Sequence, residues 1–598
     1  MTGVWHTAAS ALALIAAWNG GDAALAQSAG ATPPLAYGNA DAADSAATAP
    51  DGTTANAADN TVSGGDSDGN LADAHGPASG TAAVKPRKRT RIVPYLEVDQ
   101  TIYDQTAPEQ QTVTYTTLAA GADMLINSHS TTGVATIRYE HHFSETKAQG
   151  SSDTFTGIAR TQTQIIPHTL QFDFGGLATH TAIAANGSTY LNPVDNVGSI
   201  YQIWSLYGGP SLQTHAGIVG IKAAYDVGYN EIDQIRSYVP SGGGAPVDIF
   251  GHSLTQQGTA TLGVRPGEVA PFGLALLGNY LREDISNLDQ RLIDARLGGQ
   301  ITQPITRDLA LVGDLGWEKV QVSQRNAELD ANGNPIVGSN GQYVTNPNSP
   351  RQLAYQTDGL TWDVGVVWKP SKRTMAAAYV GQRYDSTTYY GSFYHTPNSR
   401  STLNVTVFDG VYGFGSGLMS TLQALPTDFS VTRDPFSGNV GGCYLGSTGG
   451  SCTTGALGSA NAFIYRARGV NAAYALTLGR MNFSVGTGYV TRRFITADNS
   501  VLAADNGLLD RTWYIDSSLS GPIDRQTRFV ISGFASLYRT DEPGFADSGD
   551  WGLNGMLVHH LTDHLVGTAA VEVLGIKQQL TPEQLETLGQ LGLRYNFR

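Results

Sequence analysis

Apolar and polar residues alternate with a period of two from Ile92 to the end of the chain. The alternation is clear over residues 136–143, 222–230 and 362–369. In the last of these, one face would carry Trp362, Val364, Val366 and Trp368. Successive side chains of a β-strand point to opposite faces, so each stretch predicts a strand with one apolar face and one polar or small face. We therefore expect an all-β fold.

The predicted strands are long enough to cross a membrane. Many run for about 10–14 residues, whereas strands of soluble sheets are usually about 5–6 residues long and tilted membrane strands need about 9–11. Aromatic residues gather near the ends of the apolar faces, as the interfacial girdles of membrane barrels require. They include Tyr139, Phe143, Trp362, Trp368, Tyr595 and Phe597.

The connections alternate between short and long, which is the layout of outer-membrane barrels. The short turns are predicted at 127–131, 208–210, 369–372, 396–399, 478–480, 521–524 and 561–564. The long loops are predicted at 182–198, 232–255, 321–358 and 410–461. Because a sheet in hydrocarbon must pair all of its backbone groups, residues 92–598 are expected to close into a transmembrane antiparallel up-and-down β-barrel of about 22 strands (18–24).

The first 91 residues have a different composition. A short apolar run followed by Ala24-Leu25-Ala26 predicts a cleaved signal peptide over residues 1–26. Residues 27–91 are rich in Ala, Gly and Asp and end in a basic cluster. A segment with so few large apolar groups cannot offset its ordering entropy, so a disordered N-terminal extension is expected in the periplasm.

Composition excludes several classes of protein. The formal net charge is −15, which argues against nucleic acid as a partner because a binder needs a basic face. No stretch approaches the ~20 apolar residues of a membrane helix. No spacing of residues predicts a metal site or another cofactor, and no G-x-S-x-G motif is present. Asp330-Ala-Asn-Gly-Asn-Pro335 resembles the start of a calcium loop, but Pro335 occupies the position that needs Gly, so a hairpin around Asn340-Gly341 is preferred.

The only two cysteines, Cys443 and Cys452, lie in the longest predicted loop. Export into an oxidising compartment favours a disulfide between them. Loops 321–358 and 410–461 are expected to fold inward as a partial gate, because a barrel of this size needs something inside. Acidic outer loops are a further candidate for bridging lipopolysaccharide through divalent cations. Charges on the polar face are predicted to line the lumen. They are Arg138, Glu140, Lys222, Asp226, Asp294 and Arg296.

The last strand, residues 589–598, alternates to an aromatic end at Tyr595 and Phe597. A terminal strand of this kind resembles the signal that the barrel assembly machinery reads. Several segments are also similar to a Gram-negative outer-membrane family, the barrels associated with exosortase-type exopolysaccharide systems, whose members are often labelled "preprotein translocase subunit YajC". The segments are 91–100, 114–121, 137–141, 195–201, 368–374, 382–384, 389–391 and 397–400. The resemblance implies location and fold; the translocase subunit itself is a small protein with one apolar helix, and this chain has no such helix.

Three functions remain open. The leading hypothesis is passage, either as a channel for solutes or as an accessory to surface polysaccharide export. The competing hypothesis is a non-conducting barrel that presents loops or braces the envelope. An enzyme comes third, without a motif to support it. In each case the expected location is the outer membrane, with outer-membrane lipid, lipopolysaccharide and the barrel assembly machinery as partners, and polysaccharide export components under the export hypothesis.

Overall fold

The computed structural model describes residues 89–597, apart from the segments 109, 146–151, 184–188, 191–199, 234–249, 341, 399, 447–448, 459, 542–546 and 580–581. The predicted signal peptide and nearly all of the predicted linker lie outside the described residues. The first strand begins at Arg89, within the basic cluster.

The described chain is built almost entirely of long strands. The first half contains β1 (Arg89–Ala107), β2 (Gln111–Asn127), β3 (Thr131–Ser144), β4 (Ser152–Ile166), β5 (Leu170–Ile183), β6 (Thr189–Tyr190), β7 (Ile200–Ala216), β8 (Val219–Asp233), β9 (His252–Val264), β10 (Gly273–Ile285), β11 (Gln290–Pro304), β12 (Leu309–Gln324) and β13 (Gln352–Ser371). The second half contains β14 (Thr374–Arg383), β15 (Ser386–Asn398), β16 (Ser401–Tyr412), β17 (Cys443–Gly446), β18 (Gly449–Cys452), β19 (Ile464–Leu478), β20 (Met481–Ile495), β21 (Leu509–Pro522), β22 (Thr527–Thr540), β23 (Ser548–His560), β24 (Leu565–Gln578) and β25 (Gln584–Asn596). The helices are η2 (Asn287–Asp289), α3 (Phe414–Gln423), α4 (Thr454–Leu457) and η3 (Ala503–Asp505). None of these described helices is long and apolar enough to cross a membrane.

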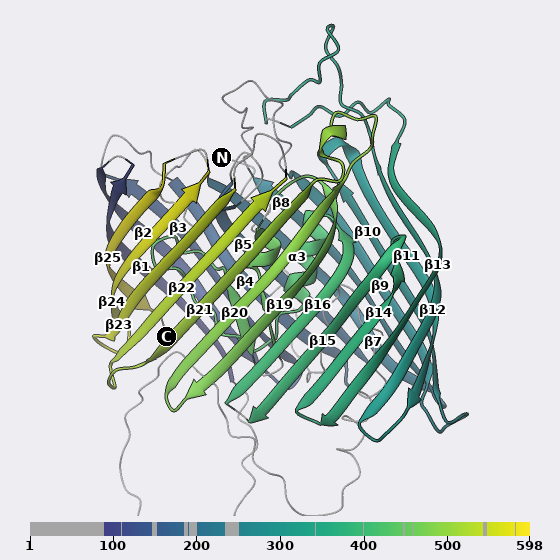
Figure 1. The fold of residues 1–598 in the computed structure, drawn as a ribbon. Coiled ribbons are helices and arrows are strands. Elements are labelled where there is room, and N and C mark those ends of the chain that lie inside the picture. Colours follow the sequence, from purple (N-terminus) through teal and green to yellow (C-terminus); the bar gives the residue numbers. More distant parts are fainter. Residues whose placement is uncertain are drawn as a thin grey trace, which may run out of the picture.

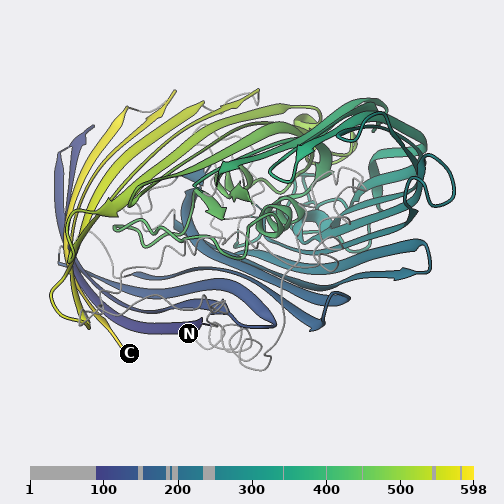
Figure 2. The same ribbon diagram turned by 90° about the horizontal axis from the view of Figure 1, so that it is seen from below.

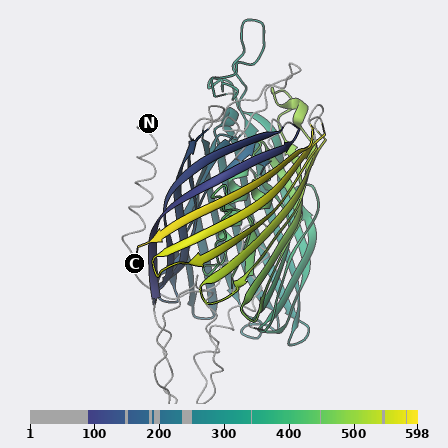
Figure 3. The same ribbon diagram turned by 90° about the vertical axis from the view of Figure 1, so that its left-hand side faces the viewer.

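Twenty-two antiparallel strands form a closed ring (Figures 1 and 2). Each strand pairs with the next one along the chain, and β25 pairs with β1 from Tyr95↔Asn596 to Ala107↔Leu585. Figure 3 shows β1 and β2 beside the yellow C-terminal strands, all steeply tilted. The ring leaves no edge strand, which confirms the predicted up-and-down barrel and its strand count.

The outer face of the ring is apolar. Leu591 is 69% exposed and Val571 is 65% exposed, values that would leave large side chains in water if the barrel were a soluble protein. The aromatic residues predicted at the ends of the apolar faces are also exposed on this side. They are Tyr139, Phe143, Trp362, Trp368, Tyr595 and Phe597. The exposed belt therefore faces lipid, and the chain is a transmembrane β-barrel.

All but one of the predicted short turns join consecutive strands at one end of the barrel, and the strands that flank the predicted long loops meet at the other end. The exception is Gly208-Gly209-Pro210, which lies inside β7; the turn that ends β7 is at Gly217-Ile218. A Cβ at Gly209 would lie 1.9 Å from the carbonyl oxygen of Tyr225 on β8. The glycine therefore permits a close approach of two strands, and the prediction of a turn there was wrong.

The loop between β12 and β13 was predicted to fold inward, and that prediction was also wrong. It forms a narrow hairpin that projects beyond the rim in Figure 1. Its own bridges pair Ala327 with Thr345 and Val337 with Tyr343, so its backbone needs no partner in the lumen. At its base Arg325 and Arg351 both pair with Asp289, at 2.8 and 2.6 Å.

Candidate functional site: a loop folded into the barrel

The loop between β16 and β19, residues 413–463, lies inside the ring, as Figure 2 shows for its helix and coil. It contains α3, the short hairpin β17–β18 and α4. Its side chains Phe414, Leu418 and Leu422 are at most 1% exposed, and they belong to one apolar cluster with wall residues of β3–β12. The prediction that loop 410–461 folds inward is confirmed.

Glu283 of β10 anchors the beginning of this loop. Its carboxylate is fully buried and accepts hydrogen bonds from the backbone N–H groups of Gly413, Gly415 and Ser416 at 3.1, 3.0 and 3.1 Å. These are the unpaired N–H groups at the start of α3, where a carboxylate is favoured. A Cβ at Gly415 would lie 2.1 Å from the hydroxyl oxygen of Ser253, so only glycine allows this close approach.

Arg433 fixes the middle of the loop to the wall formed by β3 and β4. Its guanidinium donates to the hydroxyl oxygens of Thr156 and Thr136 at 2.6 and 2.8 Å, and to the carbonyl oxygen of Gly438 at 2.8 Å. Nearby, Asn439 donates to the carbonyl oxygen of His180 on β5 at 2.6 Å. Burial raises the pKa of the Tyr444 phenol, so this loop side chain stays neutral.

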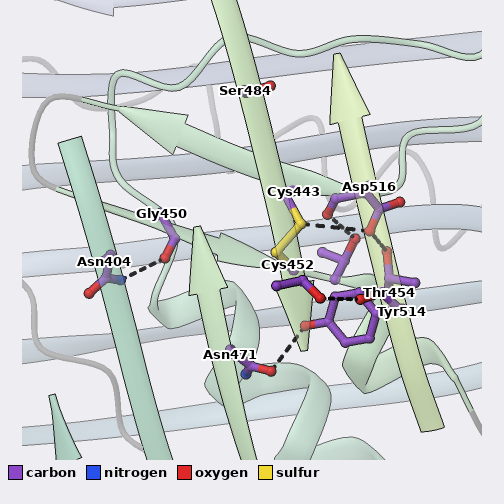
Figure 4. Close-up of a disulfide and its surroundings, with 12 residues drawn as sticks. Asn404, Cys443, Gly450, Cys452, Thr454, Asn471, Ser484, Tyr514 and Asp516 are labelled. Carbon is purple, nitrogen blue, oxygen red and sulfur yellow. Dashed lines mark hydrogen bonds between the residues drawn. A yellow bond between two sulfur atoms is a disulfide. The ribbon is translucent and has the colours of Figure 1, made fainter. Parts of the chain in front are cut away.

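The disulfide Cys443–Cys452 joins β17 to β18 and lies against the opposite wall (Figure 4). A Cβ at Gly486 of β20 would lie 2.0 Å from the Cys443 sulfur, so this glycine leaves the space that the disulfide occupies. The Thr454 hydroxyl donates to Asp516 of β21 at 3.0 Å, and Arg492 of β20 donates to the carbonyl oxygen of Gly455 at 2.8 Å.

The tip of the loop reaches a third part of the wall. Phe436 is 3% exposed and packs among Tyr103, Tyr115 and Leu588, which belong to β1, β2 and β25. Beside it Asp434 accepts a hydrogen bond from Asn554 of β23 at 3.4 Å. The loop therefore crosses the ring and contacts the wall on both sides, which narrows the lumen.

The predicted lumen charges lie on the face opposite the exposed apolar side chains. Arg138 contacts Glu140 and also pairs with Glu97 and Asp99 at 2.6 and 3.3 Å. On β8, Asp226 lies next to Gly209, and Lys222 forms no ion pair with any described residue.

Asp294 and Arg296, neighbours on one face of β11, take different partners. Arg296 pairs with Asp314 and lies 3.7 Å from Asp363, while Asp294 lies 3.7 Å from Arg383 of β14. Sequence reasoning missed Arg383. It also missed Glu283 and Arg433, because the contacts that join each of them across the lumen span 130 to 297 positions along the chain.

Tyr595, at the end of β25, and Phe597, directly after it, are exposed on the outer face, with their ring centroids 5.0 Å apart. Asp330, the first residue of the calcium-like stretch, uses one carboxylate oxygen to accept from the backbone N–H groups of Asn332 and Asn334, both at 2.8 Å. Asp330 thus holds its own turn. No group of three or more possible metal ligands occurs among the described residues.

No family model and no curated protein matches the chain. The iron transporter FrpB from Neisseria meningitidis is similar over 84% of this chain and 81% of its own, at 10% identity and a TM-score of 0.40. The ferric-catecholate import receptor Fiu from E. coli K12 is similar over 84% and 81%, at 9% identity and a TM-score of 0.41. OccK8 (OprE) from Pseudomonas aeruginosa covers 85% and 98%, at 9% identity and a TM-score of 0.25. The fold of this chain, a closed antiparallel up-and-down barrel with an apolar outer face, follows from its own strand pairing and exposed residues.

Proposed function

We propose that the protein is a channel of the outer membrane in which loop 413–463 sets the width of the passage. The observation that carries the proposal is the course of this loop from the Glu283 anchor, across the ring, to Asp516 and Asn554. Inward-folded loops restrict passage through barrels that would otherwise be wide. Polar solutes are the permeants that suit an inner wall lined by ion pairs such as those of Arg138 and Arg383.

Surface polysaccharide is a narrower candidate for the permeant. The resemblance of several strands to exopolysaccharide-associated barrels supports it, and the N-terminal tail would then lie in the periplasm near export components. Because no family model matches the chain, this assignment remains a prediction. Adjacency of the gene to polysaccharide synthesis and export genes would support it.

The experiment is single-channel conductance in planar bilayers with the full chain and a loop-deletion variant. Tyr412 and Tyr465 are directly paired at the top of β16 and β19, so a short Gly-Ser turn can replace residues 414–462 without moving either strand. We expect a small conductance from the full chain and a severalfold larger one from the variant.

A matched control removes residues 328–345 from the hairpin that projects beyond the rim, and it should leave the conductance unchanged. A full chain that passes no current would overturn the channel and favour the non-conducting barrel, whatever the variants do. Equal conductance of the full chain and the loop deletion would overturn the role of the loop.

A further inference from the structure

Four arginines lie together on the outer face of the barrel, at the end that carries the long loops. They come from four consecutive strands, β19–β22. In the register of the sheet, Arg468, Thr491, Arg511 and Arg539 form one row. The next row toward the rim contains Arg493. Its pair in the register, Arg466, is only 15% exposed and lies over the ring of the buried Tyr384. We call Arg468, Arg493, Arg511 and Arg539 the arginine row.

The arginine row begins where the apolar belt ends. The row of the sheet directly below it is formed by Val470, Tyr489, Trp513 and Leu537, all exposed on the same face. An aromatic row of this kind marks the membrane interface, and an arginine deeper in the hydrocarbon would be costly. The guanidinium groups therefore lie at the level of the lipid headgroups in the leaflet on the long-loop side.

The charge of this surface is opposite to that of the whole chain. Two aspartates neutralise part of it: Asp409 pairs with Arg466 and Arg468 at 2.8 and 3.0 Å, and Asp541 pairs with Arg511 at 2.8 Å. Asp547 also acts on Arg511, so three aspartates face Arg466 and the four residues of the arginine row. This leaves two positive charges on a protein whose formal net charge is −15. Arg493 and Arg539 are exposed and form no ion pair with any residue that the structure describes.

Acidic groups lie farther round the same rim, past β23–β25. Asp104 and Glu145 lie beside β1 and β2, and Glu145 accepts hydrogen bonds from Thr114 and Thr116 at 2.8 and 3.0 Å. The outer face also carries Arg282 and Arg291, on β10 and β11, but both pair with Asp284. A group that binds the arginine row must be anionic and must be present at the membrane interface.

We propose that the arginine row binds the phosphates of a glycolipid in the outer leaflet, with its acyl chains against the apolar row below. Guanidinium groups bind phosphate oxygens through paired hydrogen bonds and hold anionic lipid headgroups at membrane surfaces. The contact is direct, without a bridging divalent cation. This inference depends on the barrel being in a membrane but not on whether it conducts.

The test measures how much lipid A the purified full-length protein retains in detergent containing EDTA. The variant Arg493→Gln/Arg539→Gln removes the two arginines that no described carboxylate pairs with. The matched control Arg480→Gln/Arg525→Gln removes two exposed arginines from the turns at the other end of β19–β22. We expect the first variant to bind bisphosphoryl lipid A about tenfold or more weakly, because each basic residue near an anionic surface contributes substantially to binding.

The control variant should bind as the unchanged protein does, and dephosphorylated lipid A should bind weakly to all three. Equal retention by both variants, equal binding of dephosphorylated lipid A, or complete loss of binding in EDTA would each overturn the proposal. Loss of a dimer in the first variant, seen by light scattering with lipid retention unchanged, would assign the row to a second copy of the chain instead. A shift in SDS gel mobility on heating verifies that each variant has folded.

Discussion

Two glycines of α3 lie two positions apart but meet different surroundings. A Cβ at Gly415 would lie 2.1 Å from Ser253 and 2.8 Å from a Glu283 oxygen, whereas a Cβ at Gly417 would approach only the Tyr465 hydroxyl, at 3.1 Å. We expect Gly415→Ala to weaken docking of the loop by about 1–3 kcal/mol through overpacking. Gly417→Ala should be neutral or stabilise the helix by up to about 1 kcal/mol.

The rate at which a protease cleaves loop 413–463 in the folded barrel measures how firmly the loop is docked in each variant. Gly415→Ala should be cut faster than the unchanged protein, and Gly417→Ala at the same rate or more slowly. Equal rates for the two variants would mean that contacts around Glu283 do not hold the helix against the wall.

At the residue scale, the sequence was sufficient to predict contacts between residues that are close together along the chain. The cysteine pair could be predicted because both residues lie in one loop, and the disulfide is present. The acidic cap Glu283 and the loop arginine Arg433 could not, because each is defined by partners on distant strands. Their own sequence positions look like ordinary residues of a strand and a loop.

At the scale of elements, the period-two pattern was sufficient for the strands and most of their turns. It failed at Gly208-Gly209-Pro210, because the same residues that form turns also allow close contact inside a sheet. It also could not distinguish an inward loop from an outward hairpin. That outcome depends on whether the loop pairs its own backbone, as residues 325–351 largely do, or uses wall residues to satisfy it, as residues 413–463 do.

The disulfide is the covalent element of the inward loop. It closes a small ring between β17 and β18. Its loss should destabilise the docked hairpin by about 2–3 kcal/mol, mainly because the undocked loop gains conformational entropy. We expect Cys443→Ser/Cys452→Ser to raise hydrogen exchange over residues 443–452, while exchange in β20 and β21 stays unchanged. Reduction of the unchanged protein should give the same pattern. Unchanged exchange in the hairpin would show that the contacts of Thr454 and Gly455 hold it without the disulfide.

At the scale of the whole molecule, the seam between β1 and β25 decides whether the sheet has edges. Twelve residue pairs run along it, and Arg594 of β25 also reaches Asp123 of β2 at 2.6 Å and lies over the Tyr95 ring. Removing β25 would leave the backbone groups of β1 and β24 unpaired in hydrocarbon, at several kcal/mol for each group. β1 and β24 both run antiparallel to β25 and therefore parallel to each other, so they cannot restore the lost antiparallel ladder between them.

We therefore expect deletion of residues 584–598 to abolish folding into detergent micelles, measured by the loss of the heat-sensitive shift in SDS gel mobility that a closed barrel gives. The comparison is deletion of residues 328–345, a cut of similar size in a hairpin outside the ring, which should leave the shift intact. Tyr595 and Phe597 are also the predicted assembly signal, so in cells the deletion would remove both the signal and the pairing of β25 with β1. Refolding of purified chains in micelles needs no assembly machinery. Failure to fold there is therefore caused by the lost pairing of β25 with β1. If the deletion variant still gives a compact, heat-sensitive form, β24 can pair directly with β1. The barrel would then close without β25, and the prediction would be wrong.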